Sequence, residues 1–327
     1  MNNRSIPTTV PFLVAALLAV GCSNADSQNR HGVQAVRSSA PQAAPAAPPV
    51  DAQFGAYWYQ GKAELTRFAL DQARYGEIRH GDAVLIFVTE DFLADKEVKL
   101  ESEPAGRPVL PILKLNLVKK FATGIYSYSM MTSVFTPVEV AAHPHSLKVS
   151  TSSQEWCGHT FTQLNLRDSM YHVELRSYFE KEGDRDFSLD TVYLEDEVWT
   201  HIRLAPERLP TGRIRIIPGT MAQRLRHTEL DVETAAATLE PIANDPAKNG
   251  RMRYTLNYGN GDRTLSIEFE SAFPHRIMEW SETYKDGFGA KAHVLTTHAV
   301  RTNEKVIDYW TKNSTADDYL RRELGLP

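Results

Sequence analysis

Cysteine is scarce in this sequence: the 327 residues include only Cys22 and Cys157. If Cys22 is chemically modified, Cys157 has no partner left in its own chain for a disulfide. The stability of the folded part must then come from a buried core rather than from disulfide bonds.

An excess of positive charge is also absent, since the net charge is −5, and this argues against a nucleic-acid partner. After the first twenty residues, no stretch reaches the roughly 20 apolar residues that a membrane-spanning helix needs. The sequence contains no glycine-rich phosphate-binding loop and no Gly-x-Ser-x-Gly nucleophile motif. We therefore predict no cofactor.

The N-terminus combines Arg4 with an apolar run of about ten residues, 11–20, followed by Gly21 and Cys22. This pattern is typical of a cleaved signal peptide. The run that ends at Cys22 resembles the lipobox of bacterial lipoproteins, although Ala19 occupies its first position, where leucine is more usual. The resemblance implies cleavage after residue 21, acylation of Cys22 and a stable membrane anchor. Ser23 and Asn24 follow the cysteine without an aspartate, which by the same resemblance implies the outer membrane, facing the periplasm or the cell surface.

Residues 22–52 are rich in Ala, Pro, Ser and Gln and include no Phe, Trp or Tyr. Such a composition predicts a disordered tether. Residues 53–327 then form the folded part, with a soft boundary near 241–249, where Pro, Asn, Asp and Gly cluster.

Period-two alternation dominates the folded part and predicts half-buried strands. Residues 83–88 form a continuous apolar run, as expected for a strand buried on both faces. Clear alternation occurs at residues 113–117, 171–175, 252–258 and 265–269. The fold class we predict is mainly β, with a large curled antiparallel sheet or partly closed barrel.

Turn residues refine this prediction. Gly259-Asn260-Gly261 predicts a hairpin, and His80-Gly81-Asp82 predicts a second turn. We read residues 64–74 as a strand, and we read Glu195-Asp196-Glu197 as solvated charge at a strand end. A short C-terminal helix capped by Thr315 or Asp317 should end at Gly325.

The densest group of reactive side chains lies in residues 153–165. On a strand, Cys157, His159, Gln163 and Asn165 would share one face, with Glu155 and Trp156 beside them. Three interpretations remain open: a buried structural cysteine, a ligand-binding pocket, or a catalytic thiol site. A weaker metal-site hypothesis joins Cys157 and His159 to His143 and His145.

Several segments resemble a family of uncharacterised bacterial lipoproteins, over residues 57–219. The segments are 57–64, 74–77, 83–92, 129–137, 154–160 and 209–212. Members of this family are sometimes labelled Maf-type septum-formation inhibitors. The sequence lacks the Ser-Pro-Arg-Arg signature of Maf proteins, so we reject that label. The resemblance implies a lipoprotein and carries no established activity.

These observations favour a membrane-anchored envelope lipoprotein whose β domain binds an apolar ligand or another envelope protein. The alternative is a periplasmic or surface enzyme that uses Cys157 and His159 as a thiol or metal site. The sequence does not decide between them, and we favour the binding role.

Overall fold

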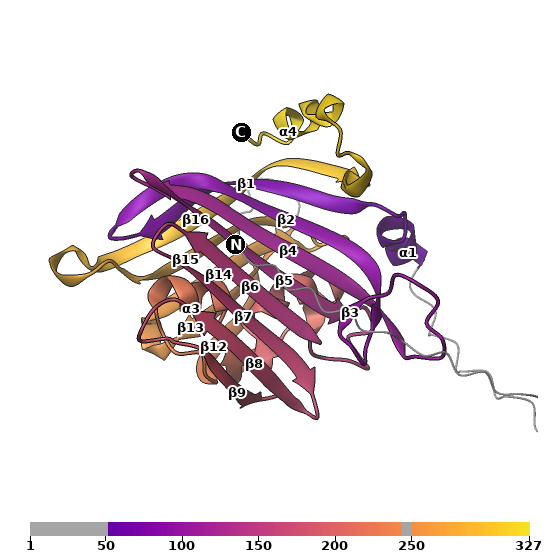
Figure 1. Ribbon diagram of the computed structural model, residues 1–327, viewed down its shortest axis with the longest axis horizontal. Helices are drawn as coiled ribbons and strands as arrows, with labels where there is room; N and C mark the ends of the chain where they lie inside the picture. Colours follow the sequence, from indigo (N-terminus) through magenta and orange to yellow (C-terminus); the bar gives the residue numbers. More distant parts are fainter. Residues whose placement is uncertain (1–51, 244–249) are drawn as a thin grey trace, which may run out of the picture. The chain divides into compact units, whose positions relative to one another are not determined.

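A sheet of sixteen strands dominates the part of the protein that the computed structural model describes, residues 52–243 and 250–327 (Figure 1). In chain order the strands are β1 Ala63–Arg74, β2 Glu77–Leu93, β3 Val98–Lys99, β4 Val109–Thr123, β5 Tyr126–Pro137, β6 Lys148–Glu155, β7 Gly158–Arg167, β8 Met170–Ser177, β9 Arg185–Asp190, β10 Tyr193–Leu194, β11 Gly212–Ile217, β12 Glu233–Pro241, β13 Arg251–Tyr258, β14 Arg263–Glu270, β15 Ile277–Asp286 and β16 His293–Ile307. The prediction of a mainly β fold is confirmed.

The strands form a meander, and the sheet curls on itself without closing into a barrel. Its hydrogen-bonded order runs from β10 to β16, continues through β1, β2 and β4, and ends at β9, while β3 pairs with β2. Neighbouring strands are antiparallel except for β10 and β11. The two ends, β9 and β10, are separated in the chain only by Thr191 and Val192. The curled antiparallel sheet expected from the sequence is present, and it is not a closed barrel.

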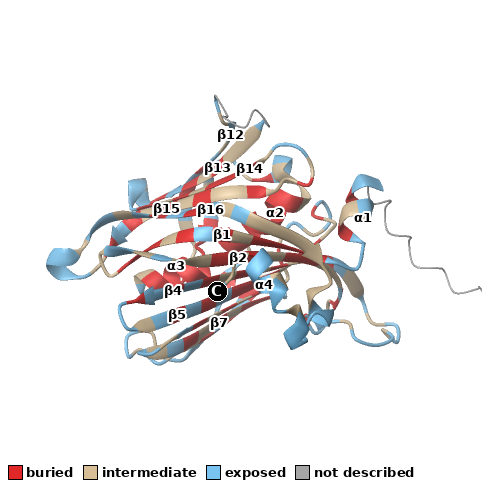
Figure 2. Ribbon diagram, turned by 90° about the horizontal axis from the view of Figure 1, so that it is seen from above, coloured by how far each residue is buried: buried red, intermediate tan, exposed pale blue. Residues whose placement is uncertain are grey.

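Short helices accompany the sheet. They are α1 Ala52–Trp58, α2 Glu195–Leu204, α3 Thr220–Arg226 and α4 Tyr319–Glu323, with single 3-10 turns η1 Pro206–Arg208, η2 Gly259–Gly261, η3 Gly289–Lys291, η4 Tyr309–Thr311 and η5 Thr315–Asp317. Helices α2 and α3 contact β4, β5 and β6 on the inner side of the curl. Buried residues gather there, on these helices and on the strands around them (Figure 2).

Inward-facing residues follow the predicted alternation. Tyr254, Leu256 and Tyr258 of β13 are buried in the main core, and their partners in β14 include Ile267 and Leu265. The β13–β14 turn contains η2, as the Gly259–Gly261 signal predicted. Residues 64–74 belong to β1, and residues 83–88 are mostly buried within β2, so these two strand predictions are confirmed.

The turn predicted at His80-Gly81-Asp82 is wrong. Strand β2 continues through Gly81, which pairs with Leu70 of β1 and Phe121 of β4, and the turn lies at Tyr75-Gly76. A Cβ atom on Gly81 would clash with the carbonyl oxygen of Lys120. Here glycine permits close approach between two strands rather than a reversal of the chain.

The interpretation of Glu195-Asp196-Glu197 as a solvated strand end is also wrong. These three carboxylates form the first turn of α2 and are all buried. Each accepts hydrogen bonds from neighbours: Glu197 accepts one from the backbone N–H of Leu194 (3.0 Å) and one from that of Ser146 (2.6 Å). Carboxylates in this position also interact favourably with the positive end of the helix dipole.

The predicted C-terminal helix is present as α4. Gly325 follows its end with φ of +75°, a conformation in which glycine meets no Cβ penalty. The capping differs from the prediction. Ser314 caps η5 by accepting a hydrogen bond from the Ala316 N–H at 3.3 Å, and the Asp317 side chain accepts one from the Ser314 N–H at 3.1 Å.

The signal peptide and most of the tether predicted over residues 1–52 lie outside the described residues, as do residues 244–249 of the predicted soft boundary. The strands on either side of that boundary, β12 and β13, pair with each other directly. Among the described residues, no helix is long and apolar enough to cross a membrane.

Candidate ligand-binding site

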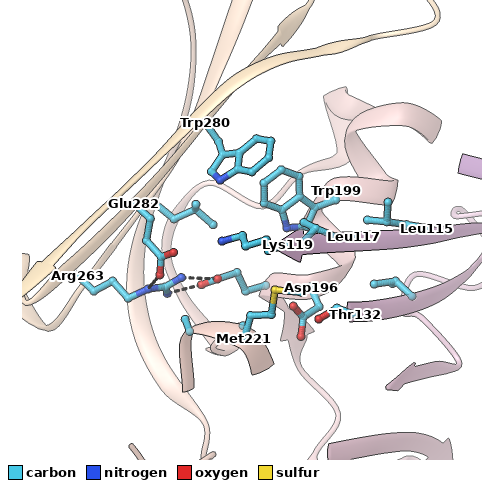
Figure 3. Close-up of a pocket in the computed structure, with 15 residues that line it drawn as sticks. Leu115, Leu117, Lys119, Thr132, Asp196, Trp199, Met221, Arg263, Trp280 and Glu282 are labelled. Atoms are coloured by element: carbon cyan, nitrogen blue, oxygen red, sulfur yellow. Dashed lines mark hydrogen bonds and ion pairs between the residues drawn. The ribbon is translucent and has the colours of Figure 1, made fainter. Parts of the chain in front are cut away.

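A small cavity lies inside the curl, between β4 and β5 on one side and β14 and β15 on the other (Figure 3). The space open to the centres of water molecules is about 40 Å³. That is enough for a few waters and too little for a metabolite.

Four charges around this inner cavity balance one another. Arg263 forms a bidentate ion pair with Glu195, at 2.5 Å for both contacts, and its Nε donates to Glu282 at 2.7 Å. Lys119 reaches toward this group and toward Trp280 (Figure 3). Burial lowers the pKa of Lys119, and the charge of Glu282 opposes that shift. We interpret this group as an internal support that joins α2 to both sides of the curl.

A much larger pocket opens at one end of the curl, and we call it the Cys157 pocket. Its volume, measured in the same way, is about 490 Å³. Aliphatic and aromatic side chains from β8, β9 and the loops form much of its wall, with charged residues among them. The lining residues are Arg74, Tyr75, Glu155, Cys157, Leu175, Phe179, Glu180, Lys181, Glu182, Arg185, Phe187, Gln223, His227, Thr228, Glu229, Leu230 and Phe288.

Cys157 lies in the two-residue turn between β6 and β7, so it is not part of the strand on which we expected it. Its backbone N–H donates to Glu155 at 2.9 Å. The thiol is free and exposed, so the interpretation of Cys157 as a buried structural residue is wrong. Cys157 and Glu155, both predicted candidates, do line the same pocket.

Two arginines lie at the base of this region. Arg74, at the end of β1, donates from Nη1 to the Leu225 carbonyl at 2.5 Å and from Nη2 to the Tyr128 hydroxyl at 3.1 Å. Arg224 of α3 forms an ion pair with Glu155 at 3.3 Å and stacks its guanidinium over the ring of Phe179 at 4.4 Å. Both arginines are buried, and Arg74 is also a lining residue, so its guanidinium is available to a ligand in the pocket.

A second polar contact joins two lining residues of the pocket. His227, the residue after α3, contacts Glu182 at 2.7 Å through Nδ1. Burial raises the pKa of Glu182, but the hydrogen bonds from His227 and Ser177 outweigh it and leave that pKa below its usual value. Glu182 is therefore ionised at neutral pH.

Several exposed apolar side chains lie on or next to segments that line the pocket. Trp156 is 72% exposed next to Cys157, and Phe288 is 65% exposed in the β15–β16 loop. Tyr178 and Ile125 add two more exposed side chains from neighbouring loops, and Tyr126 places its ring 6.4 Å from that of Trp156. Of these exposed side chains, Phe288 lines the pocket itself, whereas Trp156 and Tyr178 directly precede the lining residues Cys157 and Phe179.

The other candidates from residues 153–165 point away from the pocket. In β7 the buried inner face carries Thr160, Thr162 and Leu164, so His159, Gln163 and Asn165 lie on the opposite face. Asn165 donates to Glu97 of the loop before β3, and Gln163 donates to Asn165 at 2.8 Å. The structure therefore does not bring these three residues together with Cys157.

The four residues of the metal-site hypothesis are not brought together either. His145 contacts Glu197 at 3.1 Å, whereas Cys157 lines the pocket at the end of the curl. Within residues 52–243 and 250–327, no group of three or more His, Cys, Asp or Glu side chains is arranged to hold a metal ion.

Comparison with known proteins adds no identification. No family model, no curated protein and no solved structure matches this chain. The functional assignment therefore depends on the geometry of the Cys157 pocket.

Much of this site was not predicted from the sequence. Arg74, Phe179 and Phe288 come from separate segments, as do Gln223 and His227 at the end of α3, and no motif links them. Only the Glu155–Cys157 segment was predicted, because it belongs to a run that is dense in reactive side chains.

Proposed function

We propose that this protein is an envelope lipoprotein that binds an apolar small molecule in the Cys157 pocket. The observation that carries the proposal is the pocket itself. Its volume of about 490 Å³ lies in the range of roughly 300–1,000 Å³ that is common for small-molecule sites. Its wall combines apolar and aromatic side chains with charged and polar ones, so it can contact both an apolar chain and a polar group.

The lipoprotein part of the proposal comes from the sequence pattern around Cys22. In this proposal acylated Cys22 is the membrane partner, in the outer membrane, and the predicted tether links it to the binding domain. The exposed Phe288 in the pocket lining, together with exposed Trp156 and Tyr178 next to Cys157 and Phe179, supports entry of an apolar ligand from an apolar environment.

A second candidate is an enzyme with the Cys157 thiol as nucleophile. Its support is that Cys157 and His227 line one pocket, and thiol nucleophiles are commonly activated by a histidine. This candidate predicts a covalent adduct on Cys157 after exposure to substrate, detectable by mass spectrometry of the intact chain. A binding protein instead keeps its ligand affinity in the Cys157→Ser variant.

The experiment that tests ligand binding uses the full chain with Cys22→Ser, so that no acyl group of its own is extracted. The purified protein is extracted with organic solvent for mass spectrometry and is titrated with the neutral fluorescent probe N-phenyl-1-naphthylamine. Leu175→Trp replaces a buried leucine of β8 that lines the pocket with the larger indole ring of tryptophan. Glu174→Trp adds the same ring on the exposed opposite face of the same strand.

We expect a co-purified apolar molecule and saturable binding of the probe. Leu175→Trp should weaken probe binding about tenfold or more, whereas Glu174→Trp should change it less than about twofold. Absence of both a co-purified molecule and saturable binding would contradict the proposal. Equal effects of the two tryptophan variants would place the binding site elsewhere.

A further inference from the structure

Arg74 differs from the other buried arginines of this protein in what neutralises its charge. Arg203 pairs with Glu64, Arg263 with Glu195 and Glu282, and Arg224 with Glu155. Within the described part of the chain Arg74 forms no ion pair, and its hydrogen-bond partners are all uncharged. These partners are the Leu225 carbonyl and the hydroxyls of Tyr75 and Tyr128.

Burial makes this arrangement unfavourable for an isolated cation. The residue is only 2% exposed. A guanidinium removed from water loses several kcal/mol of hydration, which a paired carboxylate normally offsets. The carbonyl of Leu225 lies in the last turn of α3, so the helix end supplies a partial negative charge and not a full one.

Two buried or half-buried carboxylates of the Cys157 pocket, Glu155 and Glu182, already have partners. Glu155 accepts from Arg224 and from the Cys157 N–H, and Glu182 accepts from His227 and from the Ser177 hydroxyl at 2.6 Å. Burial lowers the pKa of Arg224, Glu182 opposes this effect, and the positive charge of Arg74 lowers that pKa further. Arg74 thus lies beside the paired Arg224 without a carboxylate hydrogen-bonded to its own guanidinium.

Arg74 also lines the Cys157 pocket, so its missing partner has a route in from outside. A guanidinium presents a planar set of donors that matches carboxylate and phosphate oxygens. Phe179, Phe187 and Leu230 provide an apolar wall in the same pocket.

We propose that the ligand of the Cys157 pocket is an amphiphile with an anionic head group, which pairs with Arg74 while its apolar chain lies against this wall. This inference rests on the proposed function, because it names the class of ligand for the same pocket. Carboxylate and phosphate heads share the required chemistry.

The test compares amphiphiles that differ only in the head group. Laurate, dodecyl phosphate and 1-dodecanol compete with N-phenyl-1-naphthylamine for the full chain with Cys22→Ser. We expect each anionic compound to displace the probe at a concentration about tenfold or more below that of 1-dodecanol, since charge-assisted hydrogen bonds are the stronger ones. A difference between laurate and dodecyl phosphate would identify the preferred head.

Variants then assign the preference to Arg74. In Arg74→Gln the preference for an anionic head should fall to within about twofold, with binding of 1-dodecanol unchanged. Arg185→Gln is the matched control, because Arg185 also lines the pocket but is half-exposed and pairs with Glu229 at 3.6 Å. If Arg74→Gln does not fold, Arg74→Lys keeps the charge without the planar fork and should lose affinity for laurate severalfold.

Each outcome separates the two proposals. If wild-type protein binds 1-dodecanol and laurate equally tightly, the anionic head is wrong and the apolar binding function stands. If it binds none of these compounds nor the probe, the binding function fails as well. If Arg185→Gln and not Arg74→Gln removes the preference, the assignment to Arg74 is overturned.

Discussion

Glu64 and Arg203 form a bidentate ion pair in the core, with Nη1–Oε1 at 2.6 Å and Nη2–Oε2 at 2.7 Å. Glu64 lies near the start of β1 and Arg203 near the end of α2, so the pair ties the inner helix to the sheet. Tyr57 also donates to Glu64, and the guanidinium of Arg203 lies 4.9 Å from the ring centre of Trp58. Burial alone would raise the pKa of Glu64, but Arg203 outweighs that effect and lowers it.

We predict that removal of one partner of this pair is far more damaging than removal of both. Arg203→Met leaves Glu64 as a buried carboxylate without its cation and should lower the free energy of unfolding by about 3–5 kcal/mol. The double variant Arg203→Met with Glu64→Leu leaves neither charge and should recover much of that loss. Urea denaturation followed by tryptophan fluorescence measures both.

The control is Arg215→Gln, which breaks the exposed ion pair with Asp190 (2.5 Å) between β11 and β9. It should change the free energy of unfolding by less than about 1 kcal/mol. If the effects of Arg203→Met and Glu64→Leu on the free energy of unfolding simply add in the double variant, the two side chains are not energetically coupled.

Asp196 should make stability fall as the pH rises toward neutrality. Burial raises the pKa of this carboxyl to about 7, against the opposing hydrogen bonds from Thr220. An unfolded aspartate titrates near pH 4. Between about pH 4 and 7 the folded state therefore holds a proton that the unfolded state releases, so the free energy of unfolding decreases as pH rises across that window.

Asp196→Asn removes this titration and keeps an oxygen that can accept from Thr220. Relative to Asp196→Asn, the wild-type protein should lose about 2–4 kcal/mol of unfolding free energy between pH 4 and 7. Glu64 and Glu282, whose pKa values are lowered, act in the opposite direction in both proteins and cancel in the comparison. Parallel pH profiles for the two proteins, measured by urea denaturation, would refute a buried, protonated Asp196.

The strands of the sheet could be predicted from the sequence because one face of each strand is buried. Tyr254, Leu256 and Tyr258 alternate with polar residues, and that pattern survives in the structure as inner and outer faces of β13. Helix α2 could not be predicted from such a pattern. It is buried on all sides although it begins with Glu195-Asp196-Glu197, three carboxylates that are seldom buried in proteins.

The candidate site could be predicted from the sequence only where its residues are neighbours in the chain. Glu155 and Cys157 are neighbours in one turn, and the sequence showed them together. Arg74 meets Leu225 and Tyr128 only because β1, β5 and α3 converge at one end of the curl. No spacing rule links those positions. The residues at the base of the pocket could therefore be identified only from the three-dimensional structure.

Cys22 should be the acylated residue of this chain. Metabolic labelling with an alkyne analogue of palmitate in a bacterial host should label the wild-type protein and the Cys157→Ser variant, because the lipobox resemblance concerns Cys22 alone. Cys22→Ser should remove the label and release the protein from the membrane fraction. Label on Cys22→Ser, or loss of label in Cys157→Ser, would contradict the assignment.

The Cys157 thiol should react in the folded protein and be protected by ligand. With Cys22→Ser it is the only cysteine of the chain, and it is exposed at the pocket wall. Iodoacetamide should therefore add one group per chain without denaturant, as intact-mass spectrometry would show, because accessible thiols react and buried ones do not. Saturation with laurate should slow the reaction several-fold, since the bound chain would cover part of the wall that includes Cys157.

A cysteine far from the pocket serves as the control for that protection. Val98→Cys in the Cys157→Ser, Cys22→Ser background places an exposed thiol on β3, which pairs with the end of β2 opposite the Tyr75-Gly76 turn. Its alkylation should be indifferent to laurate. Equal slowing at both positions would mean that laurate acts on the reagent or on the whole protein. No slowing at Cys157, at a concentration that displaces N-phenyl-1-naphthylamine, would place the ligand away from this thiol and remove Cys157 from the binding site.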